Sequence, residues 1–266
     1  MFQHQETGIH IAAWHGFPRI VEMLCEAGAS LSLSNEEGET ALHVAAARGH
    51  IECMRCLLDC EDGQAVIDSQ DRRGSTPLHL ALRRNHGHVA LLLLHSGADF
   101  DLLDSEGETA IHITARDGQL GLAQTLCAFG SNVDIANAEG QHPLHLAAKH
   151  GNTEVARCLC LAGASIDVAN REGVPPEVCA RVQGHAALGD LLMMLKRDGG
   201  TEEYIEQLIP TTSPINKIKI KLFGHSGVGK TTLIESLKAG YFTSLFRRSL
   251  SKKSGGYQYK GWLLTC

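Results

Sequence analysis

TALHVAA, at residues 40–46, returns in related forms along most of the chain. The copies are TGIHIAA from Thr7, TPLHLAL from Thr76, TAIHITA from Thr109, HPLHLAA from His142 and a divergent PPEVCAR from Pro175. Successive copies are 33, 36, 33, 33 and 33 residues apart, and three extra residues near 61–64 account for the longer spacing. A fixed period of this length predicts a solenoid built from small repeated units.

A column of residues that tolerate left-handed backbone follows each motif, which predicts that a helix ends there. The column consists of Gly16, Gly49, Asn85, Gly118, Gly151 and Gly184. The next segment has the apolar spacing of a second helix, in two columns: Ile20, Cys53, Val89, Leu122 and Val155, then Leu24, Leu57, Leu93, Leu126 and Leu159. Because one short helix pair cannot bury such a face alone, neighbouring pairs must stack.

Between the helix pairs, an Asn or Asp is followed three residues later by Gly, at residues 35–38, 71–74, 104–107, 137–140 and 170–173. This is turn chemistry, so each segment is predicted to form a projecting finger. The motif and the period resemble the ankyrin family. The resemblance implies an all-α ankyrin-repeat solenoid of about six repeats over residues 1–197. The first motif follows Met1 closely, so we expect the first repeat to expose a repeat interface and the array to be part of a longer one.

Composition and charge are those of a folded chain with two unlike regions. The 266 residues are 43% hydrophobic and 20% charged, with a net charge of −6. Residues 1–209 carry 14 Lys and Arg against 29 Asp and Glu, a balance of −15, whereas residues 210–266 carry ten against one, a balance of +9. The sequence contains neither a stretch long enough to cross a bilayer nor a secretory signal, which predicts a cytoplasmic location. Nine cysteines without a secretory context are expected to be reduced thiols.

One histidine recurs in each of the first five motifs: His10, His43, His79, His112 and His145. Stacked helices lie roughly 8 to 10 Å apart, too far for one metal ion to join two members of this ladder. We expect each histidine to tie its repeat to the next through a hydrogen bond. Cysteines share their positions with leucine or other aliphatic residues in other repeats, which is typical of core filling, and no metal site is predicted.

The variable positions at the end of each first helix are the predicted partner-binding residues of the concave face. They are Trp14, His15, Arg48, Arg83, Arg84, Arg116, Lys149 and His150. Tryptophan and arginine are common anchors of protein interfaces, and the fingers add carboxylates. The alternative is that these charges only keep the solenoid in solution. An array of this kind offers an extended surface and no convergent catalytic groups, so no catalytic residue is predicted.

GHSGVGKT, at residues 224–231, has the spacing of a P-loop after a predicted strand at 217–223 and before a predicted helix that ends near Gly240. Backbone N–H groups of such a loop face phosphate oxygens, its lysine neutralises them and its threonine holds magnesium. The predicted nucleotide-binding residues are therefore Gly224, His225, Ser226, Gly227, Val228, Gly229, Lys230 and Thr231. Residues 198–215 are predicted to be a linker and residues 241–266 a disordered basic tail.

This P-loop unit lacks the partners that catalysis requires. No aspartate follows Asp198, so the aspartate that would hold magnesium is missing. The 36 residues after Lys230 are also too few to complete a sheet of strand–helix–strand units. We therefore expect an incomplete domain, no cofactor in isolation, and GTP with magnesium only if other strands completed the fold.

The chain resembles the death-associated protein kinase family, in which ankyrin repeats are joined by a short linker to a segment like IKIKLFGHSGVGKTTLIESLK at residues 218–238. The resemblance extends as far as Arg248. The resemblance implies a Roc-type GTPase-like module after the repeats, partner and cytoskeletal contacts, and a role in apoptosis and autophagy signalling. The kinase signature motifs are absent from this chain, so kinase activity is not carried over. Two hypotheses follow: a non-catalytic interaction scaffold, which we favour, or a guanine-nucleotide-responsive regulator that takes its missing strands from another chain.

Overall fold

The structure, a computed structural model, describes residues 6–60 and 62–197. These residues form twelve α-helices in six pairs, with one short 3-10 helix and no β-strand. The first helices of the pairs are α1 (Gly8–His15), α3 (Ala41–Arg48), α5 (Pro77–Arg83), α7 (Ala110–Asp117), α9 (Pro143–His150) and α11 (Pro176–Val182). The second helices are α2 (Pro18–Glu26), α4 (Ile51–Asp59), α6 (Gly87–His95), α8 (Leu120–Phe129), α10 (Thr153–Leu161) and α12 (Ala186–Arg197), and η1 (Gln64–Val66) occupies the longer spacer.

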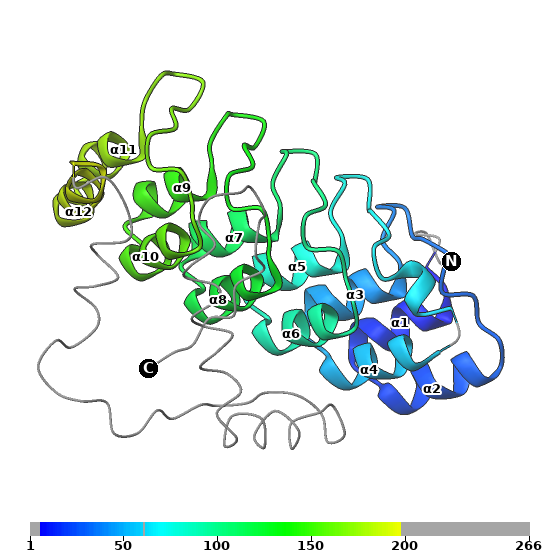
Figure 1. Cartoon of the computed structure of the whole chain (residues 1–266). Coiled ribbons are helices and arrows are strands. Elements are labelled where there is room, and N and C mark those ends of the chain that lie inside the picture. Colours follow the sequence, from blue (N-terminus) through cyan, green and yellow to red (C-terminus); the bar gives the residue numbers. More distant parts are fainter. Residues whose placement is uncertain (1–5, 61, 198–266) are drawn as a thin grey trace, which may run out of the picture. The chain divides into compact units, whose positions relative to one another are not determined.

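The helix pairs stack in sequence order as two layers (Figure 1). Each odd-numbered helix packs on the next odd-numbered one from α1 to α11, and the even-numbered helices α2 to α10 form the second layer. A single apolar core runs between the layers, and its largest fully buried side chains include Leu57, Leu93, Leu126 and Leu159. The sequence had placed these four leucines in one column, and that prediction is confirmed.

The predicted helix-ending column is also confirmed. Gly16, Gly49, Gly118, Gly151 and Gly184 all have positive φ angles, between 70° and 86°, and Asn85 has φ 58°. Asn85 is the one described non-glycine residue with positive φ, which fits the tolerance of asparagine for left-handed backbone. The chain can therefore reverse between the two helices of every pair.

A ladder of histidine hydrogen bonds joins the repeats. In His10, His43, His79, His112 and His145, Nδ1 accepts from the backbone N–H three residues earlier, so the ring proton lies on Nε2. Each Nε2 donates to a backbone carbonyl of the following repeat at 3.0 to 3.2 Å. The predicted structural role of these histidines is confirmed.

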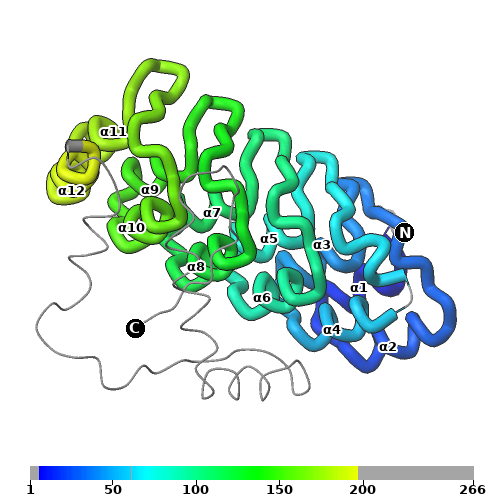
Figure 2. Tube along the Cα trace, in the orientation of Figure 1, coloured from blue at the N-terminus to red at the C-terminus, as the bar shows by residue number. Residues whose placement is uncertain are grey.

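The fingers follow one plan, which the tube in Figure 2 shows as parallel loops on one side of the helices. The side-chain oxygen Oδ1 of the leading residue accepts backbone N–H bonds from positions two and four residues later. The leading residues are Asn35, Asp71, Asp104, Asn137 and Asn170. Backbone bonds also connect the first four fingers in series, such as Arg72 N–H to the Glu37 carbonyl at 3.0 Å. The predicted turn chemistry is confirmed.

One core column departs from its prediction at the first repeat. Ile20 is 46% exposed, whereas its counterparts Cys53, Val89 and Val155 are 2% exposed or less. The reason is packing: α4 covers one side of α2, and no described helix covers the other. Ile20 therefore lies on the side of α2 that no described helix covers.

Replacement of Gly49, after α3, by alanine is expected to lower the stability of the array more than replacement of Gly184, after α11. A Cβ on Gly49 would lie 2.5 Å from the His86 ring, whereas a Cβ on Gly184 would meet nothing within 4 Å. Both residues have positive φ, so both alanine variants lose roughly 1 to 2 kcal/mol from backbone strain. Gly49→Ala should lose roughly 1 to 3 kcal/mol more through overpacking, measured by urea unfolding. Equal losses would show that this ring does not restrict the turn.

The predictions for residues 198–266 lie outside the described residues. They concern the linker at 198–215, the P-loop unit at 216–240 with its strand, and the basic tail at 241–266. They stay predictions.

Candidate functional site

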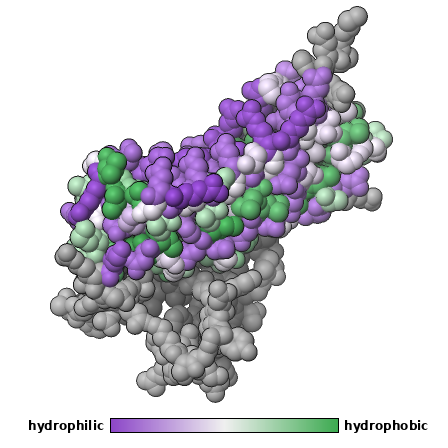
Figure 3. Space-filling view, turned by 90° about the horizontal axis from the view of Figure 1, so that it is seen from above, coloured by the Kyte–Doolittle hydropathy of each residue, from purple (hydrophilic) through white to green (hydrophobic). Residues whose placement is uncertain are grey.

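The eight predicted partner-binding residues all lie at or just after the last turn of the odd-numbered helices α1 to α9. We call this surface, together with the fingers beside it, the finger-side surface. Six of the eight are exposed: Trp14, His15, Arg48, Arg84, Lys149 and His150. Arg83 and Arg116 differ, because their side chains are only 25% and 27% exposed. Viewed from above, the molecule is mainly hydrophilic, with scattered hydrophobic areas (Figure 3).

Trp14 and Arg48 form a pair across α1 and α3. The guanidinium carbon of Arg48 lies 3.2 Å from the centroid of the Trp14 ring, a cation–π contact, and the Trp14 residue is 46% exposed. The arginine restricts the orientation of the ring while leaving nearly half of the residue open to a partner. A pre-ordered aromatic residue of this kind loses little conformational entropy when a protein binds.

Arg83 and Arg116 are instead held by two buried carboxylates. Arg83 Nη2 contacts Asp104 Oδ2 and lies 3.5 Å from Glu108 Oε2. Arg116 Nη1 donates to both oxygens of Glu108 at 2.8 Å. The Asp104 and Glu108 side chains are 1% and 4% exposed, so the arginines neutralise charges that water does not reach. These two arginines stabilise the junction between neighbouring repeats rather than standing free.

The motif analysis placed Asp104 in a finger, but it missed Glu108 and the pairing of both carboxylates with Arg83 and Arg116. Glu108 directly precedes the Thr109 motif, where other repeats have Glu39, Ser75, Gln141 or Val174. The available signal was an acidic residue at this position with an arginine eight residues later. The contacts of Arg83 with Asp104 and Glu108 could not be predicted, because these residues lie far apart along the chain.

The middle of the finger-side surface carries several exposed arginines. Arg72 and Arg73 are exposed at the tip of the second finger, and Arg84 is exposed at the end of α5. The neighbouring Arg83 Nη1 donates to Ser75 Oγ at 3.0 Å, which brings the end of α5 to the base of that finger. Within the described part of the chain, Arg48, Arg72, Arg73 and Arg84 make no ion pair.

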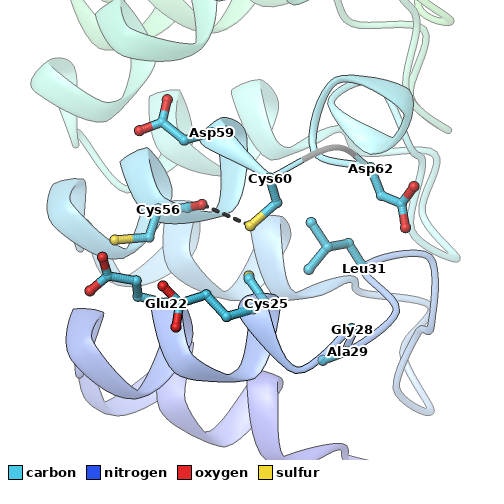
Figure 4. Close-up of a pocket in the computed structure, with 10 residues that line it drawn as sticks. Glu22, Cys25, Gly28, Ala29, Leu31, Cys56, Asp59, Cys60 and Asp62 are labelled. Carbon is cyan, nitrogen blue, oxygen red and sulfur yellow. Dashed lines mark hydrogen bonds between the residues drawn. The ribbon is translucent and has the colours of Figure 1, made fainter.

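A pocket of about 600 Å³ lies between α2 and α4, away from the predicted residues (Figure 4). Its lining includes four carboxylates and three thiols: Glu22, Glu26, Asp59, Asp62, Cys25, Cys56 and Cys60. The Cys60 thiol donates to the Cys56 carbonyl at 3.0 Å. Burial, with a hydrogen bond to Cys60, raises the pKa of Cys25 to about 12, so this thiol is a poor nucleophile at neutral pH.

The described residues contain no group of three His, Cys, Asp or Glu side chains that could hold a metal ion. No described helix has both the length and the apolar character needed to cross a membrane.

A known family model matches the repeats. The model for ankyrin repeats, in three copies, matches residues 9–104 and 88–170, which together cover more than half of the chain. The chain belongs to the ankyrin repeat family. The ankyrin solenoid also resembles the crystal structure of the ankyrin repeat domain of Bcl-3, described as a member of the IkappaB protein family. The TM-score is 0.63 and the identity 29%, over 69% of this chain and 82% of that one.

Two curated relatives match parts of the ankyrin array. Human NF-kappa-B inhibitor epsilon is 38% identical over 104 residues, which cover 36% of this chain and 21% of that protein. The probable 26S proteasome regulatory subunit p28 of Saccharomyces cerevisiae is 34% identical over 98 residues, 36% of this chain and 42% of that protein. The chain therefore spans less than half of either relative. These relatives do not support the death-associated protein kinase resemblance.

Proposed function

We propose that the chain is a non-catalytic scaffold that binds protein partners through the finger-side surface. The observation that carries this proposal is the Trp14–Arg48 pair, an exposed aromatic residue held in place by a cation at the end of two first helices. Aromatic and arginine side chains dominate binding energy at protein interfaces. Membership of the ankyrin repeat family supports the same function, because its arrays present an extended surface rather than a catalytic pocket.

The charge of this surface suggests the chemistry of the partner. Arg72, Arg73 and Arg84 are exposed and make no ion pair among the described residues, and Arg48 contacts the Trp14 ring without a carboxylate partner. The carboxylates of Asp104 and Glu108 are already neutralised. A partner segment with carboxylates and one apolar side chain for Trp14 would fit this distribution. Arginine is well suited to such a segment because its guanidinium binds carboxylates through two parallel hydrogen bonds.

The double variant Trp14→Ala/Arg48→Ala is expected to lose partners in a pull-down from cell extract analysed by mass spectrometry. Both residues are exposed, so the fold should survive, which circular dichroism checks. The matched control is Arg19→Ala on α2, whose arginine is 84% exposed and pairs only with Glu22 of the same helix. Retention of every partner by the double variant, or an equal loss with the control, would contradict the placement of the surface.

Arg84→Glu tests the charge of the surface, because Arg84 is exposed and unpaired within the described residues. Reversal of Arg83 or Arg116 would not test binding. Either change would place two or more carboxylates together in a buried site and unfold the junction.

A narrower assignment is the ankyrin region of a death-associated-protein-kinase-like regulator of apoptosis and autophagy, in the cytoplasm and in contact with the cytoskeleton. It rests on the sequence resemblance, including residues 218–238, which lie outside the described part of the chain. The proteins recovered in the pull-down test it, because cytoskeletal or apoptotic partners would support it. The guanine-nucleotide hypothesis rests on the same undescribed residues and predicts GTP-dependent assembly in light scattering.

A further inference from the structure

Two cysteines from neighbouring repeats face each other in the layer of second helices. Cys127 lies on α8 and Cys158 on α10, and these helices pack directly together. Their Sγ atoms are 3.9 Å apart, at the distance of a weak hydrogen bond between thiols. Both cysteines are free in the structure. The pair plays no part in the finger-side surface or in the proposed function.

This contact is unusual among the equivalent junctions of the array. The repeat spacing gives the corresponding pairs as Leu58 with Leu92, Leu94 with Thr125, and Cys160 with Leu191. Only the first junction also brings two thiols to these positions, Cys25 and Cys56, but there the hydrogen bond of Cys25 is to a third thiol, Cys60. The fourth and fifth repeats therefore hold an isolated pair of thiols in contact.

The thiols of the pair share one weak hydrogen bond, in which the Cys158 thiol donates to the Cys127 sulfur. Two residues further along α10, burial raises the pKa of Cys160 to about 12. Cys158 is 5% exposed and Cys127 is half-buried, so a small oxidant can approach from the Cys127 side. The thiolate is the reactive form toward peroxides.

We propose that Cys127 and Cys158 are an oxidation site at which hydrogen peroxide forms a disulfide between the fourth and fifth repeats. One sulfur of the pair attacks a peroxide oxygen as its thiolate, the O–O bond breaks, and the released hydroxide takes up a proton to leave as water. The resulting sulfenic acid is attacked by the other sulfur, the S–O bond breaks and a second water leaves. Two thiols are oxidised by two electrons and one peroxide is reduced. The sulfurs must move from 3.9 Å to about 2.05 Å to form the bond.

The bond would join α8 to α10 across 31 residues of chain. A cross-link between neighbouring repeats restricts the unfolded chain, so the oxidised array should unfold at a higher temperature than the reduced one. The change should reverse with dithiothreitol, which reduces disulfides by thiol–disulfide exchange.

The test treats the full chain with increasing hydrogen peroxide, blocks free thiols with N-ethylmaleimide and analyses a tryptic digest without reduction. Trypsin separates the two cysteines into peptides 117–149 and 158–171. We expect these peptides to appear joined, to separate with dithiothreitol, and to form before any link within the Cys25, Cys56 and Cys60 cluster. Formation of that other link first, or oxidation to sulfinic acid without a joined peptide, would overturn the proposal.

Single variants assign the bond, because peptide 158–171 also contains Cys160. Cys158→Ala and Cys127→Ala should each abolish the joined peptide, whereas Cys160→Ala should keep it. Circular dichroism of the reduced variants shows that each is folded, and fragmentation of the joined wild-type peptide locates the bond independently of any variant. A bond located to Cys160 would overturn the proposal.

Discussion

Acidification from pH 7 to pH 5 is expected to destabilise the array by on the order of 4 kcal/mol, because two buried histidines resist protonation. Burial lowers the pKa of His112 and of His145 from 6.5 to about 4. A proton on Nδ1 would also end its role as acceptor of a backbone N–H. Each ring contributes about half of the loss.

The sign follows from proton binding. Between pH 4 and 6.5 the unfolded chain binds more protons than the folded one, so the free energy of unfolding rises with pH across this window. Above pH 6.5 both states carry neutral rings and the effect vanishes. Burial also lowers the pKa of His10, His43 and His79, which adds to the loss in the same direction.

Urea unfolding at pH 7, 6 and 5, followed by circular dichroism, measures this loss. The urea concentration at the unfolding midpoint should fall as the pH is lowered, most steeply below pH 6.5. An array that is as stable at pH 5 as at pH 7 would contradict neutral, hydrogen-bonded rings in the ladder.

His112→Ala is expected to lower the free energy of unfolding by about 3 kcal/mol, through a cavity and unsatisfied polar groups. The Thr109 backbone N–H and the Thr109 hydroxyl lose their partner, and the Gln141 carbonyl keeps only its bond from the Asn137 N–H. The junction between the fourth and fifth repeats should therefore open first. Hydrogen exchange should show faster amide exchange in α7 and α9 than in α1 and α3.

The control for His112→Ala is His88→Ala on α6, where the histidine is exposed and should change stability by less than about 0.5 kcal/mol. The His112 variant should also lose part of the pH dependence, because one of the two strongly shifted rings is gone. A variant with wild-type stability and the full pH dependence would show that this histidine does not join the repeats.

The fold was predictable from the sequence because the information repeats. Each apolar position, helix-ending residue and motif histidine occurs five or six times. The role inferred for a position in one repeat can therefore be compared with the residues at the same position in the other repeats. The same periodicity predicted hydrogen bonds such as that from His43 Nε2 to the Ser75 carbonyl, 32 residues away.

Features present only once were not predictable in this way. Periodicity put Arg83 and Arg116 on the binding surface, but the carboxylates that hold them occur at one junction only. The Cys127–Cys158 contact depends on how two different repeat positions meet across α8 and α10. Ile20 follows its column in sequence, and only the packing of α2 shows that it is exposed.

Site-specific photo-crosslinking tests the proposed function most directly. A photoreactive amino acid is placed at His15 or His150 on the finger-side surface, and at Arg19 or Glu154 on second helices as controls. All four residues are exposed, so the substitutions should leave the fold intact. The proposal predicts covalent adducts with proteins of the cell extract from positions 15 and 150, and few from 19 and 154. Adducts mainly from the second-helix positions would contradict it.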